Sequence, residues 1–398
     1  MPSHSSLFLP PELWIEIFRY ATHHESLYAA DYDPFREALT ECSEHDDTLA
    51  IKYAIVRVCR QWRALGTEML YEDLRIARGV GALKHALEED DELCMKGAPI
   101  PARGRWVRRA ELEYSQSATP TSSPPPALDI LRHCPHLEVL VRPARTFHPL
   151  LFEFPAEAPP LPSLKRIDWC HDNDAARTGG INSLDEVLSR TPKLEYLSLA
   201  GNMSLGLLRQ QRHVELPALK VLRLRNVNPI FVRQVCVWSL PSLSHVIVDA
   251  LPPYQALDNI WETFGEGIQC VQLGSHMRFL TEDHLATVVA SCPHLCELNY
   301  YIFFTAPPHY TTPHPSLHSV GLHAHPNLSI HSHDTDPEEW RCIEEHFAAY
   351  DPDLFPSMKE FVLYGDDWRD VLHDPRFEAL EDKIRERGQR IVFSSIRT

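Results

Sequence analysis

One hydrophobic phrase recurs along most of the chain. A proline, any residue and then Leu-x-x-Leu-x-Leu, or a close variant, occurs eight times, first at Leu137 and last at Met358. Two weaker copies without the proline begin at Val107 and Ile268. The last two apolar positions of the phrase are two residues apart, which places them on one face of a strand. The copies stand 22 to 30 residues apart, except for a last interval of 41, and this period predicts repeated strand–helix units.

The intervals between the phrases predict the helices of the repeat. Amphipathic stretches fill five of them, at residues 127–134, 183–190, 231–239, 255–264 and 281–292. In the last stretch Thr281 is a candidate N-cap, and the acidic residues that follow it suit the helix dipole. Each proline of the phrase lacks an N–H and precedes the first leucine by two residues. We therefore expect it to end the helix and to lie outside the sheet.

The N-terminal part of the chain follows a helical period instead. Leu9, Leu13 and Ile17 recur at a spacing of four residues, as on one side of a helix. A second apolar stretch, residues 49–65, fits one or two closely joined helices. It runs into residues 69–76, which read as a short strand at the start of the repeats.

Residues 23–47 separate these two helical stretches and carry eight acidic side chains. Their few large apolar residues are Leu27, Tyr28, Tyr32, Phe35 and Leu39. Dense charge of one sign favours contact with water over burial. We expect a surface excursion with one short helix near residues 34–42.

These motifs resemble two known families joined in one chain. The CPHLEVL and CPHLCEL copies resemble the ribonuclease-inhibitor-like leucine-rich repeat, over roughly residues 100–398. LPPELWIEIF, VCRQWRAL and MLY resemble the F-box, as found in many fungal proteins with leucine-rich repeats. The resemblance implies an α/β fold in two domains. A small helical F-box-like module, residues 1–78, precedes a degenerate repeat solenoid, residues 79–398, with parallel strands on its concave face and helices on its convex face.

In the F-box family the two N-terminal helices bind the Skp adaptor of a cullin–RING ubiquitin ligase. Carried over by position, the adaptor-facing residues are Leu9, Pro10, Leu13, Ile17, Val58, Cys59 and Trp62. Two alternatives stay open. Some of these side chains can instead form the core of the helical module. The whole module can also be a cap for the open end of the solenoid in a scaffold protein that has no part in a ligase.

Strand alternation predicts which residues point away from the core and onto the concave face. They are Arg166, Asp168, Tyr196, Ser198, Arg223, Arg225, His245, Asp249, Gln272, Glu297, Asn299, Tyr301, His323 and Tyr364. Tyrosine and arginine dominate the binding energy of many interfaces, so this row is a candidate site for a protein substrate. Arg223 and Arg225 lie near its centre and suit an acidic or phosphorylated segment. A merely solvated face is the alternative.

Composition excludes several other classes of function. A net charge of −17, from 38 basic and 55 acidic residues, repels phosphate backbones and speaks against nucleic-acid binding. No signal peptide and no run of 18 apolar residues occurs, so we expect neither secretion nor a membrane span. The ten cysteines are scattered without a Cys-x-x-Cys pair. This usage is typical of reduced thiols in a cytoplasmic or nuclear protein.

No motif for catalysis is present. The chain lacks a P-loop, a G-x-S-x-G and an H-E-x-x-H sequence, and its single Gly79-Val-Gly81 lacks the third glycine of a dinucleotide site. Seven histidines fall between His309 and His333, but without cysteine spacing they are weak evidence for a metal. We therefore expect a non-enzymatic protein without a cofactor or metal, whose partners are a Skp-type adaptor and a protein substrate.

Overall fold

The computed structural model describes residues 9–39, 45–76, 80–96, 102–112, 130–143, 158–170, 184–201, 214–250, 256–275, 283–325 and 336–394. Contacts between residues divide the chain into two compact units. The first unit comprises residues 1–30 and 37–194, and the second comprises residues 31–36 and 195–398. A six-residue piece of the N-terminal region thus packs with the C-terminal half of the chain.

Three helices open the first unit: α1 (Pro11–Thr22), α2 (His45–Val58) and α3 (Arg60–Glu72). Helix α1 has Pro11 in its first turn, where the missing N–H has no helical partner to lose. The three helices share a small core of Phe18, Ile55 and Met69. Trp14, Ile15, Trp62 and Leu65 pack against this core.

Four parallel strands follow in the first unit: β1 (Asp73–Ile76), β2 (Arg109–Leu112), β3 (Val139–Arg142) and β4 (Arg166–Cys170). They pair in chain order. The described connections contain α4 (Val80–Met95), α6 (Leu184–Leu188) and the 3-10 turns η2 (Arg103–Trp106) and η3 (Leu131–His133). A further 3-10 turn, η1 (Glu25–Leu27), lies between α1 and α2.

The second unit repeats the same arrangement with more strands. They are β5 (Tyr196–Ala200), β6 (Val221–Arg225), β7 (His245–Ala250), β8 (Cys270–Leu273), β9 (Glu297–Tyr301), β10 (Ser319–His323), β11 (Glu360–Tyr364) and β12 (Arg390–Phe393). All are parallel and pair in chain order, which forms an open sheet.

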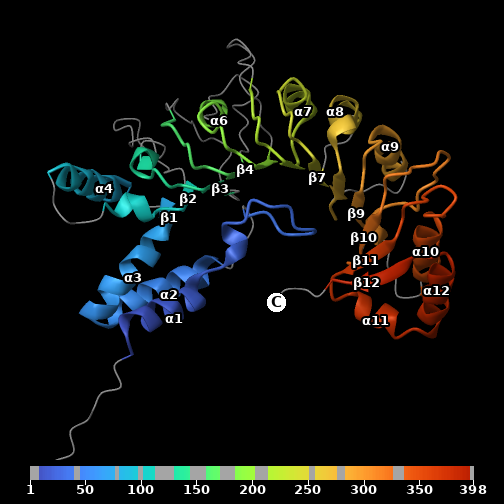
Figure 1. The fold of residues 1–398 in the computed structure, drawn as a ribbon, viewed down its shortest axis with the longest axis horizontal. Coiled ribbons are helices and arrows are strands. Elements are labelled where there is room, and N and C mark those ends of the chain that lie inside the picture. The colour runs from blue at the N-terminus through green and yellow to red at the C-terminus, as the bar shows by residue number, and fades with distance from the viewer. Residues whose placement is uncertain are drawn as a thin grey trace, which may run out of the picture. The chain divides into compact units, whose positions relative to one another are not determined.

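Helices connect these strands on one side of the sheet. They are α7 (Pro229–Val235), α8 (Ala256–Phe264), α9 (His284–Ser291), α10 (Asp336–Ala348), α11 (Trp368–Leu372) and α12 (Pro375–Glu386), with 3-10 turns η5 (Gly265–Gly267) and η6 (Ile302–Phe304). Figure 1 shows α7, α8 and α9 on the same side of the strands. The predicted solenoid-like α/β architecture of parallel strands and helices is confirmed.

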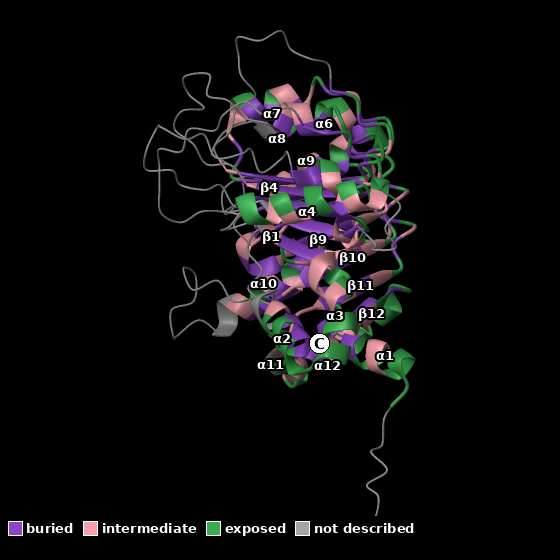
Figure 2. Ribbon diagram, turned by 90° about the vertical axis from the view of Figure 1, so that its left-hand side faces the viewer, coloured by how far each residue is buried: buried purple, intermediate pink, exposed green. Residues whose placement is uncertain are grey.

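The leucine phrases define the two faces of the sheet. Leu222 and Leu224 of β6 are completely buried, as expected for the side that carries the helices. The intervening Arg223 points to the opposite face, which we call the inner face. Figure 2 shows the strands as largely buried, whereas the helices alternate buried and exposed positions.

The predicted helices agree with the structure except at some ends. Residues 231–239 and 255–264 correspond to α7 and α8, and residues 183–190 correspond to α6. The predicted helix at residues 127–134 is described only from residue 130, where it holds the 3-10 turn η3. The cap of α9 is Asp283, whose Oδ1 accepts a hydrogen bond from the N–H of Ala286 at 2.8 Å. Thr281, which the sequence offered as the N-cap, lies outside the described residues. Among the residues described, no helix is long and apolar enough to cross a membrane.

Candidate protein-interaction surfaces

The three-helix module leaves several large apolar side chains in contact with water. Leu13 and Ile17, one turn apart on α1, are 43% and 46% exposed, and Leu9 just before the helix is 38% exposed. Val58 at the end of α2 is 60% exposed. Pro10, which caps α1, is also exposed. These residues were predicted to face an adaptor, and no element among the described residues covers them.

Trp62 differs from the other predicted adaptor residues because it packs inside the module. Its ring centroid lies 4.6 Å from that of Trp14 and 4.9 Å from that of Phe18. Cys59, the exposed N-cap of α3, accepts a hydrogen bond at its Sγ from the N–H of Trp62 at 3.4 Å. Trp62 therefore holds α1 against α3, so for this residue the core alternative fits the structure.

Helix α3 is also attached to the first repeat. The ring of Tyr71 lies 6.4 Å from that of Trp106, and its hydroxyl accepts a hydrogen bond from Arg103 at 3.2 Å. Arg103 in turn forms an ion pair with Asp90 at 2.6 Å, which lowers the pKa of that carboxyl mainly through the hydrogen bond from Arg103. The module is therefore a packed extension of the first repeat.

The inner face of the first unit is charged yet buried. Arg109 forms ion pairs with Asp73 and Glu111, and its side chain is fully buried. Arg166 and Asp168 are paired on β4, and both side chains are fully buried. Buried charges require partners that replace water, and these pairs supply part of that requirement.

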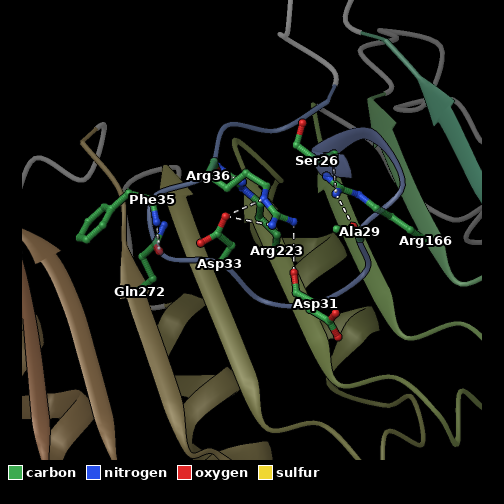
Figure 3. A network of polar contacts seen from close by, with 9 residues as sticks. All are labelled: Ser26, Ala29, Asp31, Asp33, Phe35, Arg36, Arg166, Arg223 and Gln272. Atoms are coloured by element: carbon green, nitrogen blue, oxygen red, sulfur yellow. Dashed lines mark hydrogen bonds and ion pairs between the residues drawn. The ribbon is translucent and has the colours of Figure 1, made fainter. Parts of the chain in front are cut away.

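Residues from the acidic insertion cover this face. Leu27 and Leu39 pack with Val139 and Val141 of β3 in one buried cluster. Arg166 donates a hydrogen bond to the carbonyl oxygen of Ala29 at 2.7 Å and a longer one to that of Ser26 at 3.5 Å (Figure 3). The guanidinium carbon of Arg108 lies over the ring of Tyr28, 4.9 Å from the centroid of that ring. The insertion thus supplies apolar contacts and main-chain acceptors.

The inner face of the second unit is covered in the same way by Asp31–Arg36, a segment that we call the strap. Arg223 donates a hydrogen bond to the carbonyl oxygen of Arg36 at 2.6 Å and forms an ion pair with Asp249. Gln272 accepts at its Oε1 from the N–H of Phe35 at 2.8 Å (Figure 3).

Tyr32 adds a second polar contact to the strap. Its hydroxyl donates to the same oxygen of Gln272 at 3.1 Å and accepts from Nδ2 of Asn299 at 2.6 Å. The ring of Tyr32 lies 5.0 Å from that of His245. Burial lowers the pKa of His245, so this contact is made by a neutral imidazole at neutral pH.

An aromatic socket holds Phe35. The centroid of its ring lies 5.0 Å from Tyr301, 5.1 Å from His323 and 4.9 Å from Tyr364. Burial lowers the pKa of His323 to about 4, so its ring is neutral in the socket at neutral pH. Glu297 at the edge of this surface accepts from Nδ2 of Asn299 at 2.6 Å, and burial raises its pKa.

The predicted substrate row lies on the predicted face, but it is not open to water. Arg166, Asp168, Tyr196, Ser198, Arg223, Arg225, Asp249, Gln272 and Asn299 are all buried, while His245, Glu297, Tyr301, His323 and Tyr364 are partly buried. The alternative of a merely solvated face is therefore wrong for these residues. Binding of a substrate by this row stays a prediction.

The expectation for the insertion was also wrong. Leu27 and Leu39 are 4% and 6% exposed, so this part of the insertion is packed rather than a surface excursion. No helix forms at residues 34–39, and the remainder of the predicted helix lies outside the described residues. The signal that sequence reasoning underused was the spacing of aromatic and apolar residues, such as Tyr32 and Phe35, within an acidic stretch.

No metal site is evident in the described part of the chain, where no suitable group of His, Cys, Asp or Glu side chains gathers. His314, from the histidine-rich stretch, lies 2.9 Å from the carbonyl oxygen of Cys292 and is buried. His331 and His333 lie outside the described residues. No known family model matches the chain, and no curated protein is similar enough to match it.

Proposed function

We propose that this chain is a substrate-recognition adaptor of a Skp–cullin–F-box type ubiquitin ligase. Its N-terminal module docks a Skp-type adaptor, its repeats bind a protein substrate, and other subunits transfer the ubiquitin. The chain itself then needs no catalytic residue. This function would place the protein in the cytoplasm or nucleus.

The observation that carries the proposal is the uncovered apolar surface of the helical module. Leu13, Ile17 and Val58 remain 43%, 46% and 60% exposed although the module has its own core of Phe18, Ile55 and Met69. A unit of this size buries little apolar area by itself, and residual apolar surface is a common mark of a protein interface. The F-box resemblance of the same residues supports a Skp-type adaptor as the partner.

Co-expression with a Skp-type adaptor tests this function. We expect a stable one-to-one complex with the full chain, and a loss of at least about 100-fold in affinity for Leu13→Asp, because a charge is buried without a partner. The folded chain should tolerate this change, since Leu13 is 43% exposed. Val237→Asp is a matched control, because Val237 is 57% exposed on the connection after α7. Wild-type affinity for Leu13→Asp would refute the docking mode.

A scaffold protein outside any ligase is the second candidate. It is favoured by the contacts of Tyr71 with Trp106 and Arg103, which show that α3 packs on the first repeat as a cap does. A cap needs no exposed leucines, however. If the chain is a stable monomer that binds none of the Skp-type adaptors tested, this result would support the scaffold and contradict the ligase function.

A further inference from the structure

The strap is held by side chains of the sheet, not by an added strand. Among the described residues, the main-chain hydrogen bond of the strap runs within it, from the N–H of Arg36 to the carbonyl oxygen of Asp33 at 3.3 Å. The sheet instead contributes three side chains. Arg223 contacts the carbonyl oxygen of Arg36, Gln272 the N–H of Phe35, and Asn299 the hydroxyl of Tyr32. Removing the strap would therefore leave the pairing of strands β6 to β9 unchanged.

The strap is a compact turn that stabilises itself. Pro34 and Phe35 occupy its two central positions, and Phe35 has a φ of 60°, in the left-handed region. Proline at the first central position and a positive φ at the second are the pattern of a type II turn. The guanidinium of Arg36 closes the turn onto Asp33 at 2.9 Å and onto the carbonyl oxygen of Asp31 at 3.3 Å. A turn closed by its own side chains can be presented by another protein as well.

The surface beneath the strap is shaped for a ring beside this turn. Gly321 lies in register with Asn299, and a Cβ on it would meet Oδ1 of Asn299 and, at 2.9 Å, Cε2 of Tyr364. Gly365 has a φ of +90°, and a Cβ there would collide with Cε1 of His323. Because these two glycines have no Cβ, the side chains of Tyr364 and His323 can pack around Phe35.

The strap does not satisfy this surface completely. Asn299 is 1% exposed, and its Oδ1 has no hydrogen-bond partner among the described residues. A buried acceptor without a hydrogen-bond donor destabilises the state in which it is buried, here the state with the strap bound. Phe35 also holds a positive φ, which is unfavourable for a residue with a large side chain. Both features weaken the binding of the strap to the inner face.

We propose that the inner face of the second unit is a peptide-binding site and that the strap is its built-in ligand. The site takes a protein segment with a tyrosine followed, three residues later, by a phenylalanine–arginine pair in a β-turn, and such a segment displaces the strap. This proposal deepens the proposed function by naming the class of substrate. It depends on that function only for the fate of the bound protein.

The test is a binding measurement with a peptide of the strap's own sequence, AADYDPFREA, labelled with fluorescein and added to the full chain. In the variant Tyr32→Ala with Phe35→Ala, the chain's own strap loses its hydroxyl and its ring. We expect this variant to bind the peptide at least 10-fold more tightly than the wild type does, because the site is no longer occupied. No gain in binding by the folded variant overturns the proposal.

Two controls establish where the peptide binds. Adding Gln272→Ala to the strap variant removes the acceptor of two hydrogen bonds, and we expect it to abolish the gain. A peptide in which the phenylalanine is replaced by alanine should bind at least 10-fold more weakly than the original. Equal binding of both peptides, or no effect of Gln272→Ala, would overturn the proposed site.

Hydrogen exchange of the wild-type chain covers the case in which the strap variant fails to fold. The N–H of Phe35 should exchange through a local opening, at least 100-fold faster than the strand amide of Val248. Exchange of both amides only through global unfolding would show a permanent structural element and overturn the proposal. Neither measurement contains a Skp-type adaptor, so failure of adaptor docking and failure of this peptide site are distinguishable.

Discussion

Replacing Arg223 by methionine should destabilise the second unit strongly. The ion pair of Arg223 with Asp249 has side-chain exposures of only 8% and 10%, so water cannot replace the lost partner. Burial alone would lower the pKa of Arg223, but the charges and hydrogen bonds of Asp249 and Tyr196 together outweigh burial, and the pKa is raised. Removing one partner of a buried pair lowers the free energy of unfolding by about 3–5 kcal/mol. The lost hydrogen bond to the carbonyl of Arg36 adds about 1 kcal/mol.

The double variant Arg223→Met with Asp249→Leu separates the pair from the packing around it. With both charges gone, no buried carboxylate is left alone, and the free energy of unfolding should return to within about 2 kcal/mol of the wild type. The coupling energy between the two sites, from the two single variants and the double variant, should then exceed about 3 kcal/mol. Urea denaturation followed by fluorescence measures Arg223→Met, Asp249→Leu and the double variant. An unchanged dependence of the free energy of unfolding on urea concentration shows that all of them unfold in the same reaction.

A more exposed ion pair, between residues that directly precede β6 and β5, provides the control. Lys220 and Glu195 are 2.7 Å apart, but their side chains are 56% and 31% exposed. Lys220→Met should change the free energy of unfolding by less than about 1 kcal/mol. If Arg223→Met is equally mild, or if the double variant is no better than the single one, the account of a buried and mutually dependent pair is wrong.

Three further predictions test other parts of the fold. Gly321→Ala should lower the free energy of unfolding by about 1–3 kcal/mol in urea denaturation, because its Cβ would collide with Oδ1 of Asn299. Gly104→Ala should lower the midpoint of thermal unfolding, because its Cβ would meet the rigid main-chain oxygen of His133, and an unchanged midpoint would contradict this packing. Burial lowers the pKa of His346 to about 4, whereas in the unfolded chain this histidine keeps its ordinary pKa of about 6.5. Between pH 6.5 and pH 4 the imidazole is therefore protonated in the unfolded chain but not in the folded one. Stability then falls by up to about 3 kcal/mol over this window, and His346→Gln should make urea denaturation measurably less dependent on pH there.

Much of the repeat domain could be predicted because its signal is local. The alternation of Leu222, Arg223 and Leu224 fixes which side chains face the helices, and a strand's period of two needs no distant information. The strap could not be predicted in this way, since Tyr32 and Gln272 are 240 positions apart in the chain. The short helix predicted near residue 34 failed because Pro34 and Phe35 form a turn instead.

The adaptor site illustrates the limit of helical spacing. Leu13 and Trp62 both follow the apolar period of their helices, and the period alone assigns each equally to a core or to an interface. Three-helix packing separates them, because Trp62 lies against Trp14 and Phe18 while Leu13 stays 43% exposed. Which apolar residues a small module uses for itself depends on how its helices cross, and that is a property of the assembled fold.

The polarity of the inner face bears directly on the role of the strap. A permanent core element would be most stable over apolar side chains, because buried polar groups lose water and gain at best an equivalent partner. Beneath the strap lie instead Arg223, Gln272 and Asn299, side chains that water can hydrate when the strap is absent. This polar part of the face, unlike the aromatic socket around Phe35, therefore loses little free energy when it is uncovered. The free energy needed to displace the strap is therefore lower than it would be over a wholly apolar face of the same area, and a competing segment has less to supply.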